Sequence, residues 1–375
     1  MSGIYFHIPF CKTKCTYCDF FSKTDFNQKS RVLRAMLLEI ERRANYLTDK
    51  RIATVYFGGG TPSTLAIDDV KLLLEAVNRH FELAVNAEIT LEANPDDLSF
   101  EYLKSLREVG VNRVSMGIQS FDDEQLAFIH RRHTAETAVQ AVKNAQQVGF
   151  NNISIDLIYG LPAQTLQSWK NQLEKAFTLN VQHISAYGLT YEKNTVLWKQ
   201  RQQGKVMPAD DELMIAMYEY LVEKCAENGF EQYEISNFAK QGFRSRHNSA
   251  YWTQTPYLGI GPSAHSFDGA SRQWNISSLT QYCKNLEEEK PYFEREKLTE
   301  NDQYNDYVMV CLRTREGIDM EYIQKNFGEK SLVYLMKNAQ KYLKTNHLEQ
   351  KNNFLSLTQK GILISNQIME DLMKV

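Results

Sequence analysis

The sequence has no excess of either charge and no long run of apolar residues. Its 43 lysine and arginine residues are balanced by 46 aspartate and glutamate residues, which gives a net charge of -3. This balance disfavours nucleic acid or an anionic membrane as the main partner. No stretch is apolar enough to cross a bilayer, and the start of the chain lacks the features of a signal peptide. We therefore expect a cytoplasmic protein that binds no nucleic acid.

Cysteine is also scarce, with six residues in 375. Three of them, Cys225, Cys283 and Cys311, are scattered along the chain. Disulfides are rare in a reducing compartment, and isolated cysteines there usually behave as small buried apolar side chains. We expect these three to be buried and to take no part in chemistry.

The other three cysteines form a CxxxCxxC motif at Cys11, Cys15 and Cys18. Thiolates at this spacing in one loop can bind three irons of a [4Fe-4S] cube. With no fourth cysteine nearby, the fourth iron is left for an exogenous ligand, and the amino and carboxylate groups of S-adenosylmethionine (SAM) suit that position. The alternatives are fortuitous spacing and a zinc site, for which His7 is the nearest further ligand.

Short β-rich runs alternate with helical patterns over the first 227 residues, and the strands are expected at 3–8, 53–57, 88–91, 113–118, 153–158 and 183–188. Helices are expected at 28–46, 68–81 with Asp68 as the cap, 99–110, 134–148, 166–179 and 210–227. About six βα units of this kind predict a parallel sheet or barrel. In such a barrel, active-site residues lie at the carboxyl ends of the strands.

The alternation stops near Asn237, and residues 237–275 are rich in glycine, serine, proline and aromatic residues. From residue 278 the pattern is mainly helical, with a short strand at 353–357 and a helix from Thr358. We predict an α/β protein with a partial (β/α)6 TIM-like barrel over residues 1–236. A connecting segment over 237–277 is expected to cover the barrel mouth, and a small, mostly helical, winged-helix-like domain to occupy 278–375.

The residues around the cysteine motif resemble the radical SAM superfamily. The run Tyr5-Phe6-His7-Ile8-Pro9-Phe10-Cys11, the triad and Asp19-Phe20 carry the resemblance. More narrowly, nearly the whole chain resembles the HemN/HemW branch, which contains oxygen-independent coproporphyrinogen III oxidases and haem chaperones. The resemblance implies a radical SAM barrel that binds a [4Fe-4S] cluster and SAM. In that superfamily the reduced cluster gives one electron to the SAM sulfonium and a 5′-deoxyadenosyl radical forms; whether this chain uses the radical is left open.

The resemblance also implies a SAM pocket. The run Gly58-Gly59-Gly60-Thr61-Pro62 follows the second expected strand and resembles the GGTP motif that contacts the amino group of SAM. A charged residue such as Asp156 within an apolar strand needs a partner or a ligand, and hydrogen bonds to loops are the alternative. By resemblance, the residues that bind SAM are Tyr5, Tyr17, Gly59, Gly60, Thr61, Glu92, Gln119, Arg131 and Asp156.

Two features separate the functions found within this branch. The oxidases carry a further cysteine two residues after the third cluster ligand, where this chain has Phe20. The run from Arg246 to Trp252 matches the HNxxYW motif of the chaperones, which is associated with haem binding. His247 and Tyr251 carry atoms that can bind haem iron, and Trp252 could pack on a porphyrin. The alternative is a turn with a buried aromatic pair and a hydrogen-bonded histidine.

The run from Tyr257 to Phe267 also matches the branch, and His265 in it is either a second haem-side residue or a structural histidine. We expect residues 246–267 to cover the top of the SAM site. The leading hypothesis is a haem chaperone that delivers haem to apo-haemoproteins, with transient contact to membrane-bound respiratory proteins and a homodimer as further hypotheses. A coproporphyrinogen III oxidase is the alternative. A winged-helix regulator is disfavoured because the sequence shows no recognition helix with clustered basic residues.

Overall fold

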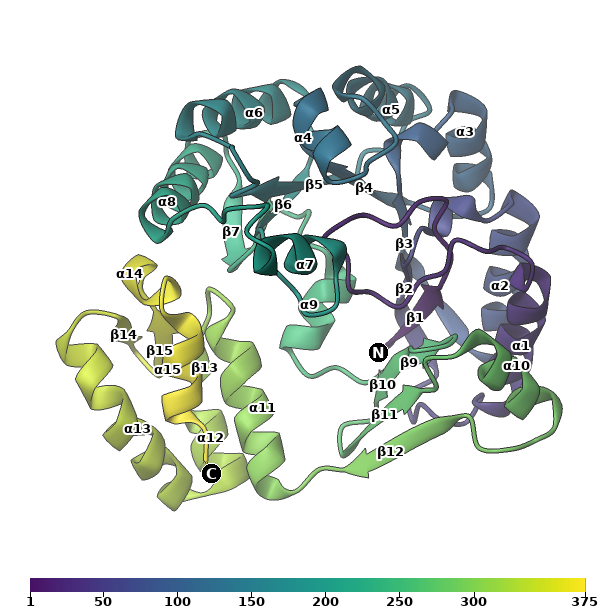
Figure 1. Cartoon of the computed structure of the whole chain (residues 1–375). Helices are drawn as coiled ribbons and strands as arrows, with labels where there is room; N and C mark the ends of the chain where they lie inside the picture. The colour runs from purple at the N-terminus through teal and green to yellow at the C-terminus, as the bar shows by residue number, and fades with distance from the viewer. Residues whose placement is uncertain (375) are drawn as a thin grey trace.

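The structure, a computed structural model, describes residues 1–374. A large α/β unit is followed by a small C-terminal unit (Figure 1). The large unit is built on a curved 12-stranded sheet in the order β12-β11-β10-β9-β1-β2-β3-β4-β5-β6-β8-β7. Its six central strands are parallel, as the sequence pattern predicted. They are β1 (Ser2–Ile8), β2 (Arg51–Gly59), β3 (Glu82–Ala93), β4 (Arg113–Gln119), β5 (Ile153–Tyr159) and β6 (His183–Gly188).

Helices cover the convex face of this sheet (Figure 1). They are α1 (Lys29–Arg42), α2 (Ile67–His80), α3 (Phe100–Glu108), α5 (Ala135–Gln147), α6 (Leu166–Thr178) and α8 (Asp211–Glu227). The short helices α4 (Asp123–Phe128) and α7 (Val196–Gln202) lie in the loops after β4 and β6. The expectation that Asp68 caps α2 is wrong. The cap is Ala66, whose backbone N–H donates to the Asp69 carboxylate at 3.1 Å.

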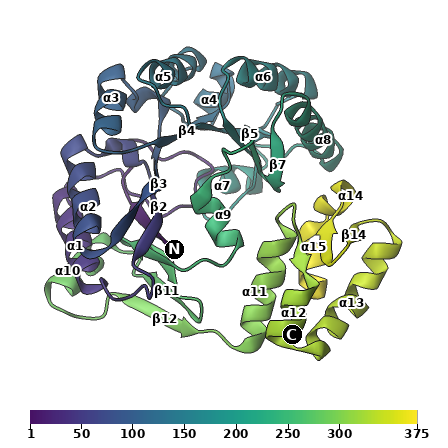
Figure 2. The ribbon, with the colours of Figure 1, turned by 180° about the vertical axis from the view of Figure 1, so that it is seen from behind.

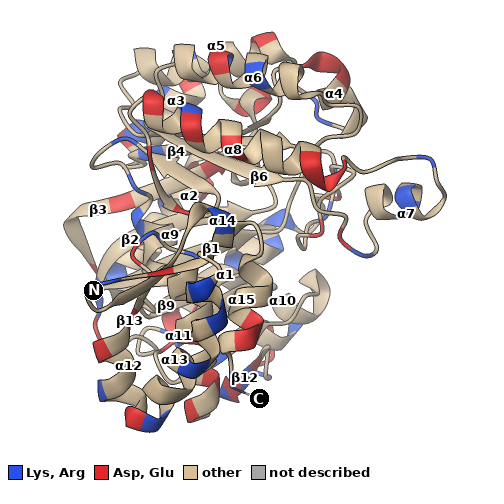
Figure 3. Cartoon of the chain, turned by 90° about the vertical axis from the view of Figure 1, so that its left-hand side faces the viewer, with Lys and Arg blue, Asp and Glu red and all other residues tan. Residues whose placement is uncertain are grey.

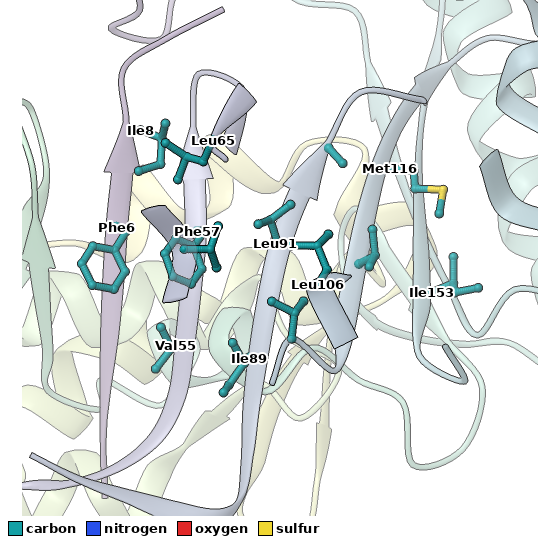
Figure 4. Close-up of a cluster of buried hydrophobic side chains, with 14 of the residues drawn as sticks. Phe6, Ile8, Val55, Phe57, Leu65, Ile89, Leu91, Leu106, Met116 and Ile153 are labelled. Carbon is teal, nitrogen blue, oxygen red and sulfur yellow. The ribbon is translucent and has the colours of Figure 1, made fainter. Parts of the chain in front are cut away.

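The main core lies between the sheet and these helices. Side chains alternate along each strand, so that Phe6 and Ile8 point from β1 toward the helices while Tyr5 and His7 point to the concave side. Phe6 is in register with Phe57, and their rings stack at 4.8 Å. Figure 4 shows apolar side chains of neighbouring strands forming one continuous layer. The concave side is left to polar residues.

The predicted connecting segment instead adds strands to both ends of the sheet. β8 (Asn237–Ala239) lies between β6 and β7 (Glu231–Glu234). Beyond the short helix α9 (Arg246–Trp252), β9 (Tyr257–Ile260) pairs in parallel with β1. The antiparallel strands β10 (His265–Phe267), β11 (Ser271–Asn275) and β12 (Phe293–Lys297) complete that end.

The predicted domain boundary at residue 278 is also wrong. Helix α10 (Leu279–Glu287) packs against α1, and its Leu279, Tyr282 and Leu286 belong to the core of the large unit. The core of the C-terminal unit begins with Tyr304. Residues 278–297 therefore complete the α/β unit, because α10 buries its apolar face on it and β12 pairs with β11.

A buried carboxylate fastens the added strands to α1. Glu39 is fully buried and accepts hydrogen bonds from the Tyr282 hydroxyl at 2.5 Å, Asn275 Nδ2 at 2.7 Å and Gly261 N at 2.8 Å. Arg43, one turn later on α1, forms an ion pair with it at 3.3 Å and is also buried. One side chain thus joins α1, α10, β11 and the loop after β9.

The C-terminal unit has the helix and strand order of a winged helix. Its elements are α11 (Glu300–Leu312), β13 (Ile318–Asp319), α12 (Met320–Phe327), α13 (Glu329–Lys344), β14 (Leu348–Lys351), β15 (Phe354–Leu357), α14 (Gln359–Ile362) and α15 (Ser365–Leu372). The three strands form a separate sheet. The segment after α11 pairs with β7, since Ile235 N donates to Arg313 O and Arg315 N donates to Tyr233 O, both at 3.1 Å.

Charges of both signs are interspersed over the helices seen in Figure 3, where α7 projects from the rest of the molecule. At the far end of the large sheet, every residue of β12 is exposed, and four of its five residues are charged. Within residues 1–374, no helix is both long enough and apolar enough to cross a membrane.

Candidate functional site

The first cysteine is fixed by the glycine-rich loop after β2. Gly60 N donates to Ile8 O at 2.8 Å, and Thr61 N donates to Phe10 O at 2.7 Å. The Thr61 hydroxyl donates to the Cys11 thiol at 3.3 Å. A Cβ on Gly60 would lie 2.7 Å from Ile8 O and 2.8 Å from Phe10 O, so only glycine fits this close approach. The two loops are therefore built as one unit.

The other two cysteines lie later in the same loop and are more exposed than Cys11. The Arg131 guanidinium donates to Cys15 Sγ at 3.6 Å. Burial, the largest cause, and the two neighbouring cysteines raise the pKa of Cys18 to about 11, although the main chain at Phe20 opposes this rise. A thiol of this kind remains protonated at neutral pH unless a cation lies beside it, and metal binding supplies that cation. Metal binding by this triad therefore requires Cys18 to lose its proton.

The geometry disfavours the zinc alternative. Both ring nitrogens of His7 are engaged, Nδ1 with the Tyr5 hydroxyl at 3.2 Å and Nε2 with Phe21 O at 2.8 Å. Within residues 1–374, no three His, Cys, Asp or Glu side chains converge closely enough to hold a metal ion. His7 is therefore not free to complete a zinc site with the cysteines.

A cavity of about 510 Å³ opens beside the three cysteines at the carboxyl ends of the central strands. It brings together the cluster candidates and eight of the nine residues predicted to contact SAM. Its lining includes Cys11, Cys15, Cys18, Tyr17, Gly59, Gly60, Thr61, Glu92, Gln119, Arg131 and Asp156. Side chains that the sequence analysis did not single out also line it, among them Phe20, Asn94, Ser115, Tyr187 and Glu192.

Tyr5 is the exception among the predicted SAM residues, because it does not line this cavity. Its hydroxyl is directed to His7, and its ring stacks on that of Tyr56 at 6.2 Å. Tyr5 thus lies in the layer beneath the cavity. A direct contact of Tyr5 with SAM stays a prediction.

Two carboxyl groups give the cavity an acidic wall. Burial, the largest cause, raises the pKa of Glu92 to about 7 and that of Asp156 to about 6. Arg113 at the start of β4 opposes both shifts and is itself 1% exposed. Within the described chain, its guanidinium forms no ion pair and its Nε has no hydrogen-bond partner. Arg113 was not identified from the sequence, although a charged residue at the start of an apolar strand could have indicated it.

The end of β4 is shaped to expose polar groups. Gln119 has a φ of 70°, a left-handed conformation that costs a non-glycine residue about 1–3 kcal/mol and often marks functional sites. A Cβ on Gly117 would lie 2.9 Å from Gln119 Nε2 and 3.1 Å from Arg131 Nη2. Arg131 also donates to Asn94 Oδ1 at 2.7 Å, and its buried Nε has no partner within residues 1–374. Glycine at 117 therefore leaves room for both side chains.

Helix α9, which carries the HNxxYW motif, lies at the other end of the barrel. It contacts Gly3, Thr54 and Glu88, which lie side by side in register on β1, β2 and β3 and precede the residues of β2 and β3 that line the cavity. In Figure 1 the cysteine loop and α7 face the viewer, whereas α9 faces the viewer in the opposite view of Figure 2. The expectation that residues 246–267 cover the top of the SAM site is therefore wrong for residues 246–252.

His247 is the buried residue of the motif, whereas Tyr251 and Trp252 are half-buried. His247 is 2% exposed, and its Nδ1 and Nε2 are hydrogen-bonded to the Thr54 hydroxyl at 2.8 Å and the Tyr251 hydroxyl at 2.9 Å. Burial and, to a smaller extent, Arg113 lower the pKa of His247 to about 3, so that the ring is neutral at physiological pH. The Arg313 guanidinium carbon lies over the Trp252 ring, 5.7 Å from the ring centroid.

The remaining predicted residues lie apart from the cavity. His265 on β10 is exposed beside Trp274, with a ring separation of 6.4 Å, and makes no hydrogen bond to the described chain. Cys225, Cys283 and Cys311 are buried, as expected, and each is a free thiol.

The chain is similar to known proteins over its whole length. Residues 5–176 match the radical SAM superfamily, and residues 298–364 match the HemN C-terminal domain. The heme chaperone HemW of Bacillus subtilis is 35% identical over 374 residues, which cover 98% of each chain. HemW of Lactococcus lactis is 33% identical and covers 98% of this chain and 96% of its own.

A solved structure, that of the Escherichia coli coproporphyrinogen III oxidase HemN, described as a radical SAM enzyme, has the same fold. It matches 99% of this chain and 90% of its own with a TM-score of 0.86 at 24% identity. These matches agree with the cysteine loop and the cavity at the strand ends. The chain belongs to the HemN/HemW branch of the radical SAM superfamily, whose membership implies a [4Fe-4S] cluster and SAM as cofactors.

Proposed function

We propose that this protein is a haem chaperone that holds a [4Fe-4S] cluster and SAM, binds haem as cargo and delivers it to apo-haemoproteins. The observation that carries the proposal is the 35% identity to HemW of Bacillus subtilis over 98% of both chains. Phe20 supports it, because this 63% exposed side chain stands where the oxidases have a further cysteine. The recipients of the haem, contact with membrane-bound respiratory proteins and a homodimer remain predictions.

In this proposal Cys11, Cys15 and Cys18 hold the cluster, which supplies one-electron reduction of SAM when both are bound. SAM occupies the adjoining cavity. The main chain of Gly59 and Gly60 allows close approach to it, and the Glu92 and Asp156 carboxylates complement its positive charge. Tyr17, Thr61, Gln119 and Arg131 complete the lining. The unpartnered Arg131 Nε is the feature of this chain that such a ligand would satisfy.

The assignment of haem to His247, Tyr251 and Trp252 remains a prediction, and the geometry restricts it. Both ring nitrogens of His247 are engaged, so iron ligation requires at least one of these hydrogen bonds to break. Of the three, Trp252 is the residue with a free polar atom, since its buried Nε1 has no partner within residues 1–374.

The function is tested by anaerobic reconstitution followed by two parallel assays. Titration with haemin is expected to give a Soret shift that saturates at a fixed stoichiometry. Incubation with SAM, reductant and coproporphyrinogen III is expected to yield no protoporphyrinogen IX. A missing Soret shift contradicts the chaperone, whereas formation of the product supports the oxidase.

The affinity for SAM is expected to rise with pH. Glu92 and Asp156, with pKa values of about 7 and about 6, attract the SAM cation only when ionised, so protonation weakens binding. Lowering the pH from 8 to 5.5 should raise the Kd for SAM by about tenfold or more. Equilibrium binding checks this, with cluster absorbance monitored throughout. Glu92→Gln should flatten the profile above pH 6.5, and an unchanged profile in that variant contradicts the assignment.

A further inference from the structure

The rings of His247, Tyr56 and Tyr5 pack together on the concave side of the sheet, between α9 and the SAM cavity. We call these three rings the column. His247 lies on the ring of Tyr56 at 4.9 Å with an interplanar angle of 23°. Tyr5 lies beside both, 6.2 Å from Tyr56 and 6.3 Å from His247, at angles of 26° and 25°. Stacked rings in close contact move together because the interior is tightly packed.

The lower end of this column is fixed. The backbone N–H groups of Arg246 and His247 both donate to the Glu88 carboxylate at 3.1 Å, which anchors the start of α9. The two side-chain hydrogen bonds of His247 hold its ring in one orientation. A Cβ on Gly3 would lie 2.9 Å from Thr54 Oγ1 and 3.4 Å from the His247 ring. Thr54 and His247 are therefore packed closely against the backbone of β1.

The upper end of the column reaches the cavity. The Tyr56 hydroxyl donates to Glu92 Oε1 at 2.7 Å, and Glu92 lines the cavity. A Cβ on Gly58 would lie 2.9 Å from the Tyr56 ring, 3.0 Å from Tyr5 and 3.2 Å from Glu92 Oε1. The absence of a side chain at Gly58 therefore allows the two tyrosine rings and the Glu92 carboxylate to lie in contact. Because the Tyr56 hydroxyl is hydrogen-bonded to Glu92, a tilt of the Tyr56 ring would move the carboxylate.

We propose that His247 is a positioning residue for SAM: it holds Tyr56 upright, and the Tyr56 hydroxyl directs the Glu92 carboxylate into the cavity. The proposal rests on the proposed contact of Glu92 with SAM. It gives the histidine of the HNxxYW motif a role distinct from iron ligation. The role follows from contacts that are all made in the described chain.

Arg113 belongs to the same interior. Burial raises the pKa of Glu92 to about 7 and lowers that of His247 to about 3; the buried charge of Arg113 opposes the first shift and adds to the second. A neutral imidazole can accept a hydrogen bond on one nitrogen and donate on the other, as the contacts to Thr54 and Tyr251 require. The column therefore has the protonation states that its geometry needs.

The test measures SAM affinity in the reconstituted full-length protein for His247→Ala, Tyr56→Phe, their double variant and Glu92→Gln. His80→Ala, a replacement on α2 far from the column, is the matched control. SAM is titrated against the reduced cluster and followed by its electron paramagnetic resonance signal. Haemin is titrated in parallel, and thermal unfolding of each variant is recorded.

Each single variant of the column is expected to raise the Kd for SAM by about tenfold, a coupling typical of residues in contact. The double variant should be no weaker than either single variant, because both act through the same carboxylate. His247→Ala should also alter the SAM-induced change in the cluster signal, while the His80→Ala control stays at the wild-type level. General destabilisation would not produce this non-additive pattern.

Other outcomes overturn the proposal in distinguishable ways. If Glu92→Gln binds SAM normally, the proposed SAM contact fails and the positioning role fails with it. If Glu92→Gln is weakened but His247→Ala is not, the positioning role alone is wrong. Loss of haemin binding in His247→Ala with SAM affinity intact favours iron ligation instead. Should His247→Ala not fold, Tyr56→Phe decides the matter, because it removes one oxygen atom and normal SAM binding in it overturns the proposal.

Discussion

Replacing Cys15 with serine is expected to abolish assembly of the cluster. The residue lies at the centre of the triad, and Arg131 Nη1 donates to its sulfur at 3.6 Å. A serine hydroxyl is a hard, weakly acidic ligand that iron–sulfur clusters bind poorly in place of a soft thiolate. After anaerobic reconstitution, the variant should lack the visible absorbance of the cluster and should contain far less iron than the wild-type protein.

The control for this experiment is Cys311→Ser. Cys311 is a buried free thiol in the core of the C-terminal unit, so the change removes a sulfur without touching the triad. This variant should keep four irons per chain. A Cys15→Ser protein that still held four irons after desalting would contradict the ligand assignment. Retention of SAM by the clusterless variant should also be weak, because the cavity then lacks the open iron.

The second large effect is expected at Glu39. Glu39→Ala should lower the free energy of unfolding by about 3–5 kcal/mol, the usual result of breaking a buried ion pair by removing one partner. Arg43, which is 6% exposed, would keep its charge without the carboxylate. The Tyr282 hydroxyl and Asn275 Nδ2 would also lose the acceptor that joins them to α1.

Urea unfolding followed by circular dichroism measures this change. Glu41→Ala lies on the same helix but is exposed, and it should change stability by no more than about 0.5 kcal/mol. Glu39→Gln keeps the shape of the side chain and part of its hydrogen bonding. Its loss of unfolding free energy should therefore fall between those of Glu39→Ala and Glu41→Ala. Equal midpoints for Glu39→Ala and Glu41→Ala would show that the buried network contributes nothing to stability.

Much of the large unit could be predicted from the sequence because its local signals agree with its fold. The alternation of β-rich and helical segments identified the six parallel strands, because repeated βα units favour a parallel sheet. The cysteine spacing and the polar residues at strand ends located the cavity for the same reason. Parallel strands bring their carboxyl ends to one edge, so Glu92 and Asp156 had to lie near each other and near the cysteine loop.

The position of α9 could not be predicted in this way. It has seven residues and no periodic pattern, so nothing local indicates which end of the barrel it contacts. Its place follows from long-range pairing: β8 joins one end of the sheet and β9 joins β1, and the chain between them must cross the open side of the barrel. Tyr56 was missed because it looked like one more apolar residue of β2, although its hydroxyl meets Glu92.

The two ends of the 12-stranded sheet bear on how this protein behaves at high concentration. An open sheet presents unpaired backbone groups at its outer strands, and these can recruit strands from other molecules. Here the β7 end is closed by the main chain of residues 313–315, and the β12 end carries Glu294, Arg295, Glu296 and Lys297. Removal of the C-terminal unit would therefore expose the unpaired edge of β7. We expect a protein truncated before residue 313 to self-associate at concentrations at which the full-length protein does not.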